Sequence, residues 1–174
     1  MKHSRRMYLK LAVSTILAAT FAAPAFADEA PEAAAEPQVH EVLMYNADPN
    51  DKKKKMVFVP DLLRANPGDT IRFISSDKSH NAVSDKLMLP EGADAFKSKI
   101  SKDFEYVVTA EGTYGYFCQP HRNMGMVGLI LVGDPSSNYE EAKAAIAKQK
   151  GKAKKVYKDI FERADAMLAT EQGS

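Results

Sequence analysis

The stretch YGYFCQPHRNMGMVGLILV, residues 114–132, dominates the interpretation of this chain. Its apolar runs, residues 114–117 and 127–132, predict two strands joined by a short loop. The loop concentrates side chains that bind soft metals, with one thiol, one imidazole and two thioethers: Cys118, His121, Met124 and Met126. The stretch therefore predicts a rigid sheet that presents several metal donors in one loop.

The first 27 residues predict an export signal. They contain four basic residues and no acidic one, an apolar segment at residues 11–21, and Ala25-Phe26-Ala27, which is typical of a cleavage site. Arg5 and Arg6 leave the twin-arginine and the general secretory routes both open. Either route leads to the periplasm, with a mature chain that begins at Asp28. No later stretch is long and apolar enough to span a membrane, so we expect no stable membrane insertion.

The charge of the mature chain argues against a nucleic-acid partner. The chain has 24 basic and 23 acidic residues, and four of the basic ones belong to the export signal. The remainder is slightly acidic, so electrostatic steering must come from local clusters of charge.

Turn residues divide residues 39–134 into short strands. Residues 28–38 are acidic and rich in alanine and proline, and they predict a mobile leader before the first strand. Short strands, frequent turns and no long helix between them favour an antiparallel β-sandwich. The predicted strands are residues 39–45, 56–60, 70–74, 104–109, 113–118 and 127–132.

Residues 135–174 differ in composition and predict a helical segment. A capping box at residues 137–140 predicts a first helix that continues to about Gln149. A second helix is expected from about Ala153 to Ala169, and its apolar stripe predicts packing on the sandwich, with a membrane-surface or partner-binding helix as the alternative. The stripe consists of Val156, Ile160, Ala164, Met167 and Leu168.

Cys118 is the only cysteine, so it cannot form a disulfide within the chain. In an oxidising compartment this leaves an intermolecular disulfide, a reactive thiol or a metal ligand. His80, in Lys78-Ser79-His80-Asn81, supplies a second imidazole. Two imidazoles, one thiolate and one weak thioether are the donor set of a blue-copper electron-transfer site. Spacing alone leaves Met124 and Met126 both open as the thioether, and we interpret His40 as structural.

Together, Cys118-Gln119-Pro120-His121, the following Met124-Gly125-Met126, the His80 segment and the two helices resemble the pseudoazurins, members of the cupredoxin family. The resemblance covers residues from about 39 to 168. It implies an eight-stranded Greek-key β-sandwich with two C-terminal α-helices and one type 1 copper. It also implies that the copper ligands are His80, Cys118, His121 and Met126, with Met126 axial.

Two further residues are expected to tune the site. The Asn81 amide can tie the two ligand loops together, and its backbone N–H can point at the Cys118 sulfur. Pro120 has no N–H to offer that sulfur.

We therefore expect a monomeric, non-enzymatic carrier of single electrons in the periplasm. The resemblance implies copper nitrite reductase or another denitrification enzyme, and c-type cytochromes, as partners. Cations expected around the exposed edge of His121 are Lys52 to Lys55, Lys78, Lys97, Lys99 and Arg122.

Two alternatives remain from the residues. A copper carrier without redox turnover would usually show repeated methionines and histidines or a CxxC pair, which the sequence lacks. A Cys118-dependent enzyme with His121 or His80 as base lacks an evident oxyanion loop or orienting acid.

Overall fold

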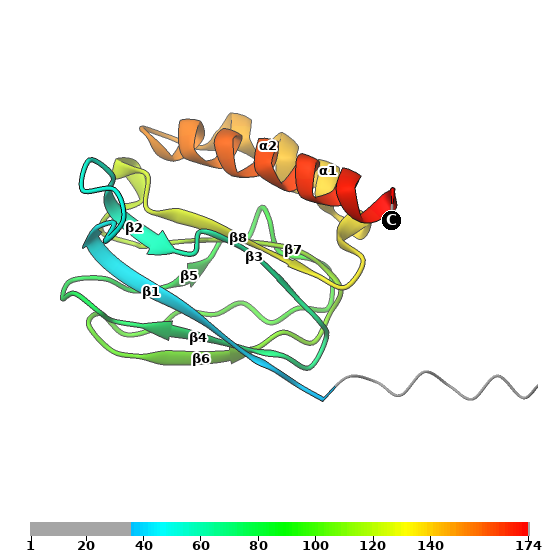
Figure 1. Ribbon diagram of the computed structural model, residues 1–174, viewed down its shortest axis with the longest axis horizontal. Coiled ribbons are helices and arrows are strands. Elements are labelled where there is room, and N and C mark those ends of the chain that lie inside the picture. Colours follow the sequence, from blue (N-terminus) through cyan, green and yellow to red (C-terminus); the bar gives the residue numbers. More distant parts are fainter. Residues whose placement is uncertain (1–35, 174) are drawn as a thin grey trace, which may run out of the picture. The chain divides into compact units, whose positions relative to one another are not determined.

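Two four-stranded sheets stack face to face in the computed structural model, which describes residues 36–173 (Figure 1). The predicted export signal, residues 1–27, and most of the predicted leader lie outside this range. The first sheet has the strand order β2 (Lys55–Val59), β1 (Val39–Ala47), β4 (Thr70–Ile74), β6 (Phe104–Val107). The second has the order β3 (Leu62–Ala65), β8 (Val127–Val132), β7 (Gly112–Phe117), β5 (Val83–Ser84). The predicted β-sandwich is therefore confirmed.

Each sheet is mixed, because it contains one parallel pair of strands. β1 pairs with β4 in parallel and β3 pairs with β8 in parallel, while the other neighbours are antiparallel. Alternation of apolar residues reports which face of a strand is buried and carries no information on strand direction. The predicted all-antiparallel pairing is corrected accordingly. β3 is a strand of four residues just after Pro60-Asp61 and was not among the predicted strands.

The burial of β8 explains the continuous apolar run at residues 127–132. All six of its residues are buried. Successive side chains of a strand point to opposite faces, so Ile130 and Val132 enter the core between the sheets. Val127, Leu129 and Leu131 face the other way and contact the helical segment. A strand buried on both faces loses the polar alternation of a half-exposed strand.

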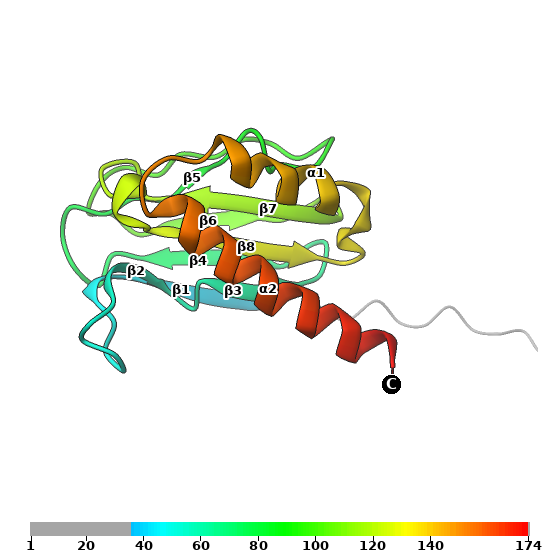
Figure 2. The ribbon, with the colours of Figure 1, turned by 90° about the horizontal axis from the view of Figure 1, so that it is seen from above.

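The helical segment covers the outer face of the second sheet (Figure 2). It comprises α1 (Tyr139–Ala144), a 3₁₀ turn at Ala145–Lys148 and α2 (Ala153–Gln172). No helix among the described residues combines the length and the apolarity needed to cross a membrane. Packing of the second helix on the sandwich was thus predicted correctly, and its predicted stripe was correct in part: Ile160 and Ala164 are buried, and the other three residues pack against the same buried cluster. Val156, Met167 and Leu168 are only half-buried. The buried residues are Ala153, Tyr157, Ile160, Phe161 and Ala164.

Tyr157 occupies the centre of this stripe because its hydroxyl has a partner. The hydroxyl donates to the Tyr116 carbonyl of β7 at 2.9 Å. A buried tyrosine is tolerated where its O–H finds an acceptor. The predicted stripe did not include this aromatic ring, which is buried beside Ile160 and Ala164.

The predicted capping box at residues 137–140 is wrong. α1 begins after Asn138, which makes no side-chain capping bond. The Asn138 amide bonds to β7 instead, accepting from the Thr113 N–H at 2.7 Å and donating to the Thr113 carbonyl at 2.9 Å. A bond to another element has replaced the local cap, and it fixes the start of the helical segment on the sheet.

Asp69 joins the start of β1 to the turn before β4 and gives the fold a pH dependence. Its buried carboxylate accepts from the Gln38 and Asn66 N–H groups, both at 2.8 Å, and lies 2.8 Å from His40 Nε2. Burial raises the pKa of Asp69, but these bonds outweigh it and hold the pKa below the ordinary value of 3.8. His40 is therefore structural, as predicted.

We expect Asp69→Asn to lower the unfolding free energy by about 1–2 kcal/mol at neutral pH. A carboxyl with a lowered pKa in the folded state stabilises above its unfolded pKa and loses that effect as the pH falls through the folded value. The variant should lose part of the wild-type decline in stability on acidification. Urea unfolding of both proteins between about pH 6 and pH 2 measures this, and parallel pH profiles would contradict it.

Candidate metal centre

Three of the predicted ligands come from one loop, which joins β7 to β8. Cys118 follows the last residue of β7, and its N–H donates to the Met126 carbonyl at 2.9 Å. The N–H of Met126 in turn donates to the His121 carbonyl at 3.2 Å. A 3₁₀ turn at Arg122–Met124 separates His121 from Met126, and Gly125 ends it with φ 97°, a value that favours glycine. These bonds fix the backbone of the loop, in which Cys118 and His121 approach one point.

His80 reaches the same point from the segment between β4 and β5. Its Nδ1 lies 3.8 Å from Cys118 Sγ and 3.1 Å from His121 Nδ1, and His121 Nδ1 lies 3.5 Å from the sulfur. A point equidistant from three atoms so arranged is about 2 Å from each, which is a metal–nitrogen bond length and slightly shorter than a typical metal–thiolate bond. His80, Cys118 and His121 form the one three-residue cluster of metal-binding side chains found among residues 36–173. The structure thus brings together the donors that the sequence separates.

The two methionines of the loop differ in position. Met126 is fully buried in the same core cluster as Cys118, whereas Met124 is 48% exposed and does not belong to that cluster. Spacing left both open as the thioether, and burial favours Met126.

Asn46, near the end of β1, supports the site and was not found from the sequence. Its side-chain oxygen lies 3.1 Å from Nε2 of His80. An amide oxygen only accepts, so Nε2 carries the proton and Nδ1 keeps its lone pair toward the centre. A histidine between two strands and an asparagine near the end of a third are too weak a signal to find before the strands are paired.

Protonation at the centre also fits a metal. Burial, and then the charge of His121, lower the pKa of His80, so the imidazole is neutral and able to coordinate. Burial raises the pKa of the Cys118 thiol, and backbone hydrogen bonds from Asn81 and His121 oppose that rise only in part. A buried thiolate at this place requires a further positive charge, which a metal ion supplies.

Asn81 acts as predicted. Its side-chain oxygen accepts from the Gln119 N–H at 2.9 Å, which ties the His80 segment to the Cys118 loop. Its backbone N–H hydrogen bonds to the sulfur. Its amide nitrogen donates to the Ser98 carbonyl at 3.3 Å. Bonds of this kind orient ligands and tune the metal.

Arg122 does not belong to the exposed ring of cations in which the sequence analysis placed it. Its guanidinium donates to the buried carboxylate of Asp85 at 2.6 Å and to Gln149 Oε1 at 2.8 Å, and it stacks on the Phe117 ring at 4.0 Å. Gln149 Nε2 also donates to Asp85, at 2.9 Å. Arg122 therefore clamps the ligand loop between the β5 side of the sandwich and the helical segment.

A buried set of two imidazoles and one thiol beside a methionine, at one end of this sandwich, defines a copper protein of the cupredoxin class. Residues 46–133 match the family described as copper binding proteins, plastocyanin/azurin family. A pseudoazurin of Paracoccus pantotrophus is 44% identical over 161 residues, which cover 92% of this chain and 94% of that protein. A pseudoazurin of Methylorubrum extorquens is 42% identical over 129 residues, or 74% and 83% of the two chains.

Solved structures agree with these relatives. The structure of a pseudoazurin from Sinorhizobium meliloti superposes with a TM-score of 0.66 at 39% identity, over 71% of this chain and 94% of that one. The chain belongs to the pseudoazurins. It is a non-enzymatic electron carrier with a type 1 copper site of the His-Cys-His-Met type.

Replacement of Pro120 by alanine should raise the reduction potential. Pro120 lies between Cys118 and His121 and has no N–H. An added N–H near the sulfur would stabilise the charge of the thiolate, reduce its donation to Cu(II) and favour Cu(I). Protein-film voltammetry of the Pro120→Ala protein measures the shift, and an unchanged or lower potential would contradict the prediction.

Proposed function

We propose that His80, Cys118, His121 and Met126 hold the copper, and that the protein shuttles single electrons between periplasmic partners. The observation that carries the assignment is the geometry of the three donor atoms around a point at metal-bonding distance, together with the burial of Met126. Copper in such a donor set supplies one-electron chemistry with little change in geometry.

The chain's own residues hold this geometry. His80 is fixed by Asn46, the Cys118 sulfur by the Asn81 N–H, and the loop by the hydrogen bonds of Met126. His80 and Cys118 are fully buried and exclude water, while His121 is half-buried and Pro120 beside it is exposed. Electrons therefore leave through His121.

The partners that we propose are a copper nitrite reductase or another denitrification enzyme, and c-type cytochromes. Lysines on the surface would steer acidic partners and allow brief contact. Those offered by the sequence analysis, Lys52 to Lys55, Lys78, Lys97 and Lys99, are all exposed. Export of residues 28–174 to the periplasm and a monomeric state belong to the same proposal.

The test is spectroscopic and kinetic. Copper(II) added to the purified mature protein should give an intense thiolate-to-copper absorption band and a narrow copper hyperfine splitting in EPR, with reversible voltammetry. Stopped-flow mixing of the reduced protein with a copper nitrite reductase, and of the oxidised protein with a reduced c-type cytochrome, then tests the partners. A colourless Cu(I) protein that does not turn over would support a copper carrier instead.

A further inference from the structure

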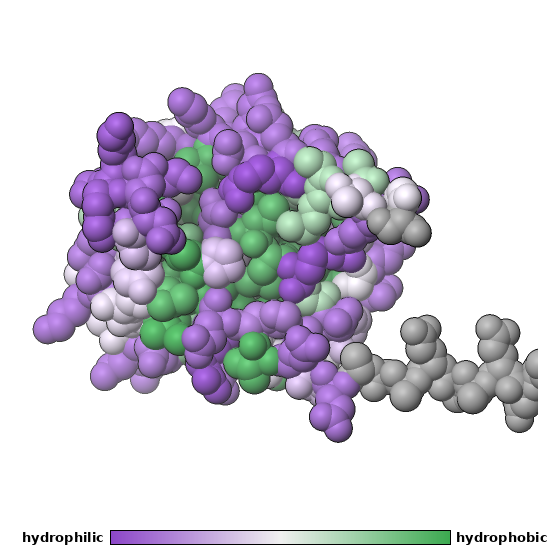
Figure 3. All heavy atoms as spheres, viewed as in Figure 1, coloured by the Kyte–Doolittle hydropathy of each residue, from purple (hydrophilic) through white to green (hydrophobic). Residues whose placement is uncertain are grey.

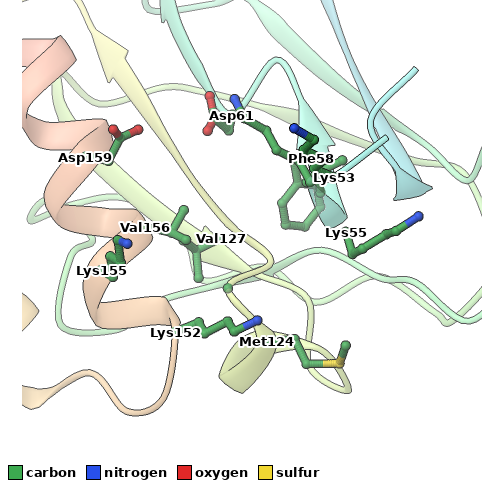
Figure 4. A pocket seen from close by; sticks show the side chains of 13 residues that line it. Lys53, Lys55, Phe58, Asp61, Met124, Val127, Lys152, Lys155, Val156 and Asp159 are labelled. Atoms are coloured by element: carbon green, nitrogen blue, oxygen red, sulfur yellow. The ribbon is translucent and has the colours of Figure 1, made fainter. Parts of the chain in front are cut away.

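A groove runs beside the ligand loop, between the first half of α2 and β2 with the loop before it. Its volume is about 470 Å³, and its walls include Val57 of β2, Val127 of β8 and Val156 of α2. Figure 3, drawn from the same side as Figure 1, shows a hollow under α2. Apolar residues lie in this hollow, and hydrophilic side chains lie on both sides of it. In Figure 4, Val156 and Val127 meet between α2 and β8. The groove offers an apolar floor that a side chain of a partner could enter.

The rim of the groove is strongly positive. Five lysines line it, and none of their ammonium groups forms an ion pair with another residue of the described range: Lys53, Lys54, Lys55, Lys152 and Lys155. The two carboxylates of the same lining, Asp61 and Asp159, are both engaged by Arg163, at 2.9 and 3.2 Å. The groove therefore keeps an excess of positive charge, because five lysines face two carboxylates that already have an arginine partner.

One end of the groove is the ligand loop itself. Met124 and Gly125 belong to the lining, and Lys152 extends from the start of α2 toward Met124 (Figure 4). Contact is close here, because a Cβ added to Gly125 would lie 2.9 Å from Val156 Cγ2. A segment bound in the groove would thus lie beside the 3₁₀ turn that begins directly after His121.

We propose that this groove anchors an acidic segment of a redox-partner protein, with an apolar side chain on the floor and carboxylates on the lysine rim. The inference rests on the proposed electron-carrier function and adds the place and the chemistry of the partner contact. Excess positive charge selects an anionic partner, and an apolar floor selects against a partner that carries charge alone.

The probe is the capped peptide Asp-Glu-Leu-Phe-Glu-Asp, added to the copper-loaded protein. We expect binding, with NMR chemical-shift changes at residues 53–57, 124–127 and 152–156. Lys152→Glu/Lys155→Glu should weaken binding at least tenfold at low salt. The matched control, Lys150→Glu/Lys154→Glu, makes the same change of charge at exposed positions outside the groove and should weaken binding less than threefold.

If the two double variants lost the same affinity for the peptide, the groove would not be the binding site, because net charge alone would then explain the binding. Equal binding of a peptide with both apolar residues replaced by serine would overturn the role of the floor. Self-association of the protein, or binding of phosphatidylglycerol vesicles in preference to the peptide, would assign the surface to another occupant. These failures differ from failure of the proposed function, because absorption, EPR and voltammetry of the same samples report the copper site independently. Without a type 1 spectrum, both proposals fall.

Discussion

Replacement of Cys118 by serine is expected to abolish the intense visible absorption of the copper-loaded protein and to weaken copper binding by more than about 100-fold. Loss of residues that merely support a ligand costs about 10- to 100-fold in affinity, so loss of the thiolate itself should exceed that range. The absorption arises from electron transfer between the thiolate sulfur and copper, and an alcohol oxygen at this place supplies neither the soft bond nor the transition. Absorption spectra measure the visible band, and competition with a copper chelator measures the affinity for copper.

Two methionine variants provide the controls. Met124→Leu changes a half-exposed side chain outside the core and should leave the spectrum unaltered. Met126→Leu removes the proposed weak axial donor and should keep the colour while raising the reduction potential. The ligand assignment would be wrong if Met124→Leu changed the spectrum, if Met126→Leu left the reduction potential unchanged, or if Cys118→Ser remained blue.

The sequence predicts the fold well where one strand carries its own pattern. β4 alternates between buried and half-exposed residues, and its predicted limits, residues 70–74, match the structure. β8 was found from its apolar run. Strand direction was not predictable, because the parallel pairing of β1 with β4 depends on how distant segments meet. The capping box failed for a similar reason, since Asn138 bonds to β7 and not to its own helix.

The metal donors were predictable for a chemical reason, namely that one unpaired cysteine in a chain predicted to be exported needs a partner. The residues that orient these donors were predictable only in part. Asn81 lies next to His80 in the sequence, and its role could be inferred. Asn46 is far from His80 in the sequence, and Asp85 and Gln149 are far from the ligand loop, so only the tertiary structure brings each to its partner. Arg122 was misassigned to the surface because a charged residue in a loop is usually solvated.

The contacts of Arg122 with Asp85 and Gln149 lead to a second prediction, which concerns the stability of the fold. Arg122→Met should lower the unfolding free energy by about 2–3 kcal/mol. Loss of one partner from a fully buried ion pair costs about 3–5 kcal/mol, because the other charge is left buried. The Asp85 side chain is 5% exposed, but Arg122 is 31% exposed and Gln149 still donates to the carboxylate, so the cost is smaller here.

Urea unfolding of the copper-free protein measures this effect without the metal. Arg72→Met is the matched control, because Arg72 pairs with Glu41 and Glu105 at the surface, where such pairs contribute about 1 kcal/mol or less. Adding Asp85→Asn to Arg122→Met should recover part of the loss, since it removes the unpaired charge. If Arg122→Met lowered the unfolding free energy no more than Arg72→Met does, the contacts of Arg122 would not contribute specifically to stability.

The same variant should also alter the copper site, because those contacts hold the residue next to His121. Asn123, which follows Arg122, accepts from the Lys152 N–H at 2.9 Å, so the loop is bound to the helical segment at two adjacent residues. Without the guanidinium, only the backbone bond remains. We expect copper affinity to fall by about 10-fold and the EPR hyperfine splitting to change, as for other residues that orient a ligand. A purely structural role would lower stability and leave the spectrum of the folded, copper-loaded protein unaltered, so the two measurements together separate positioning of His121 from support of the fold.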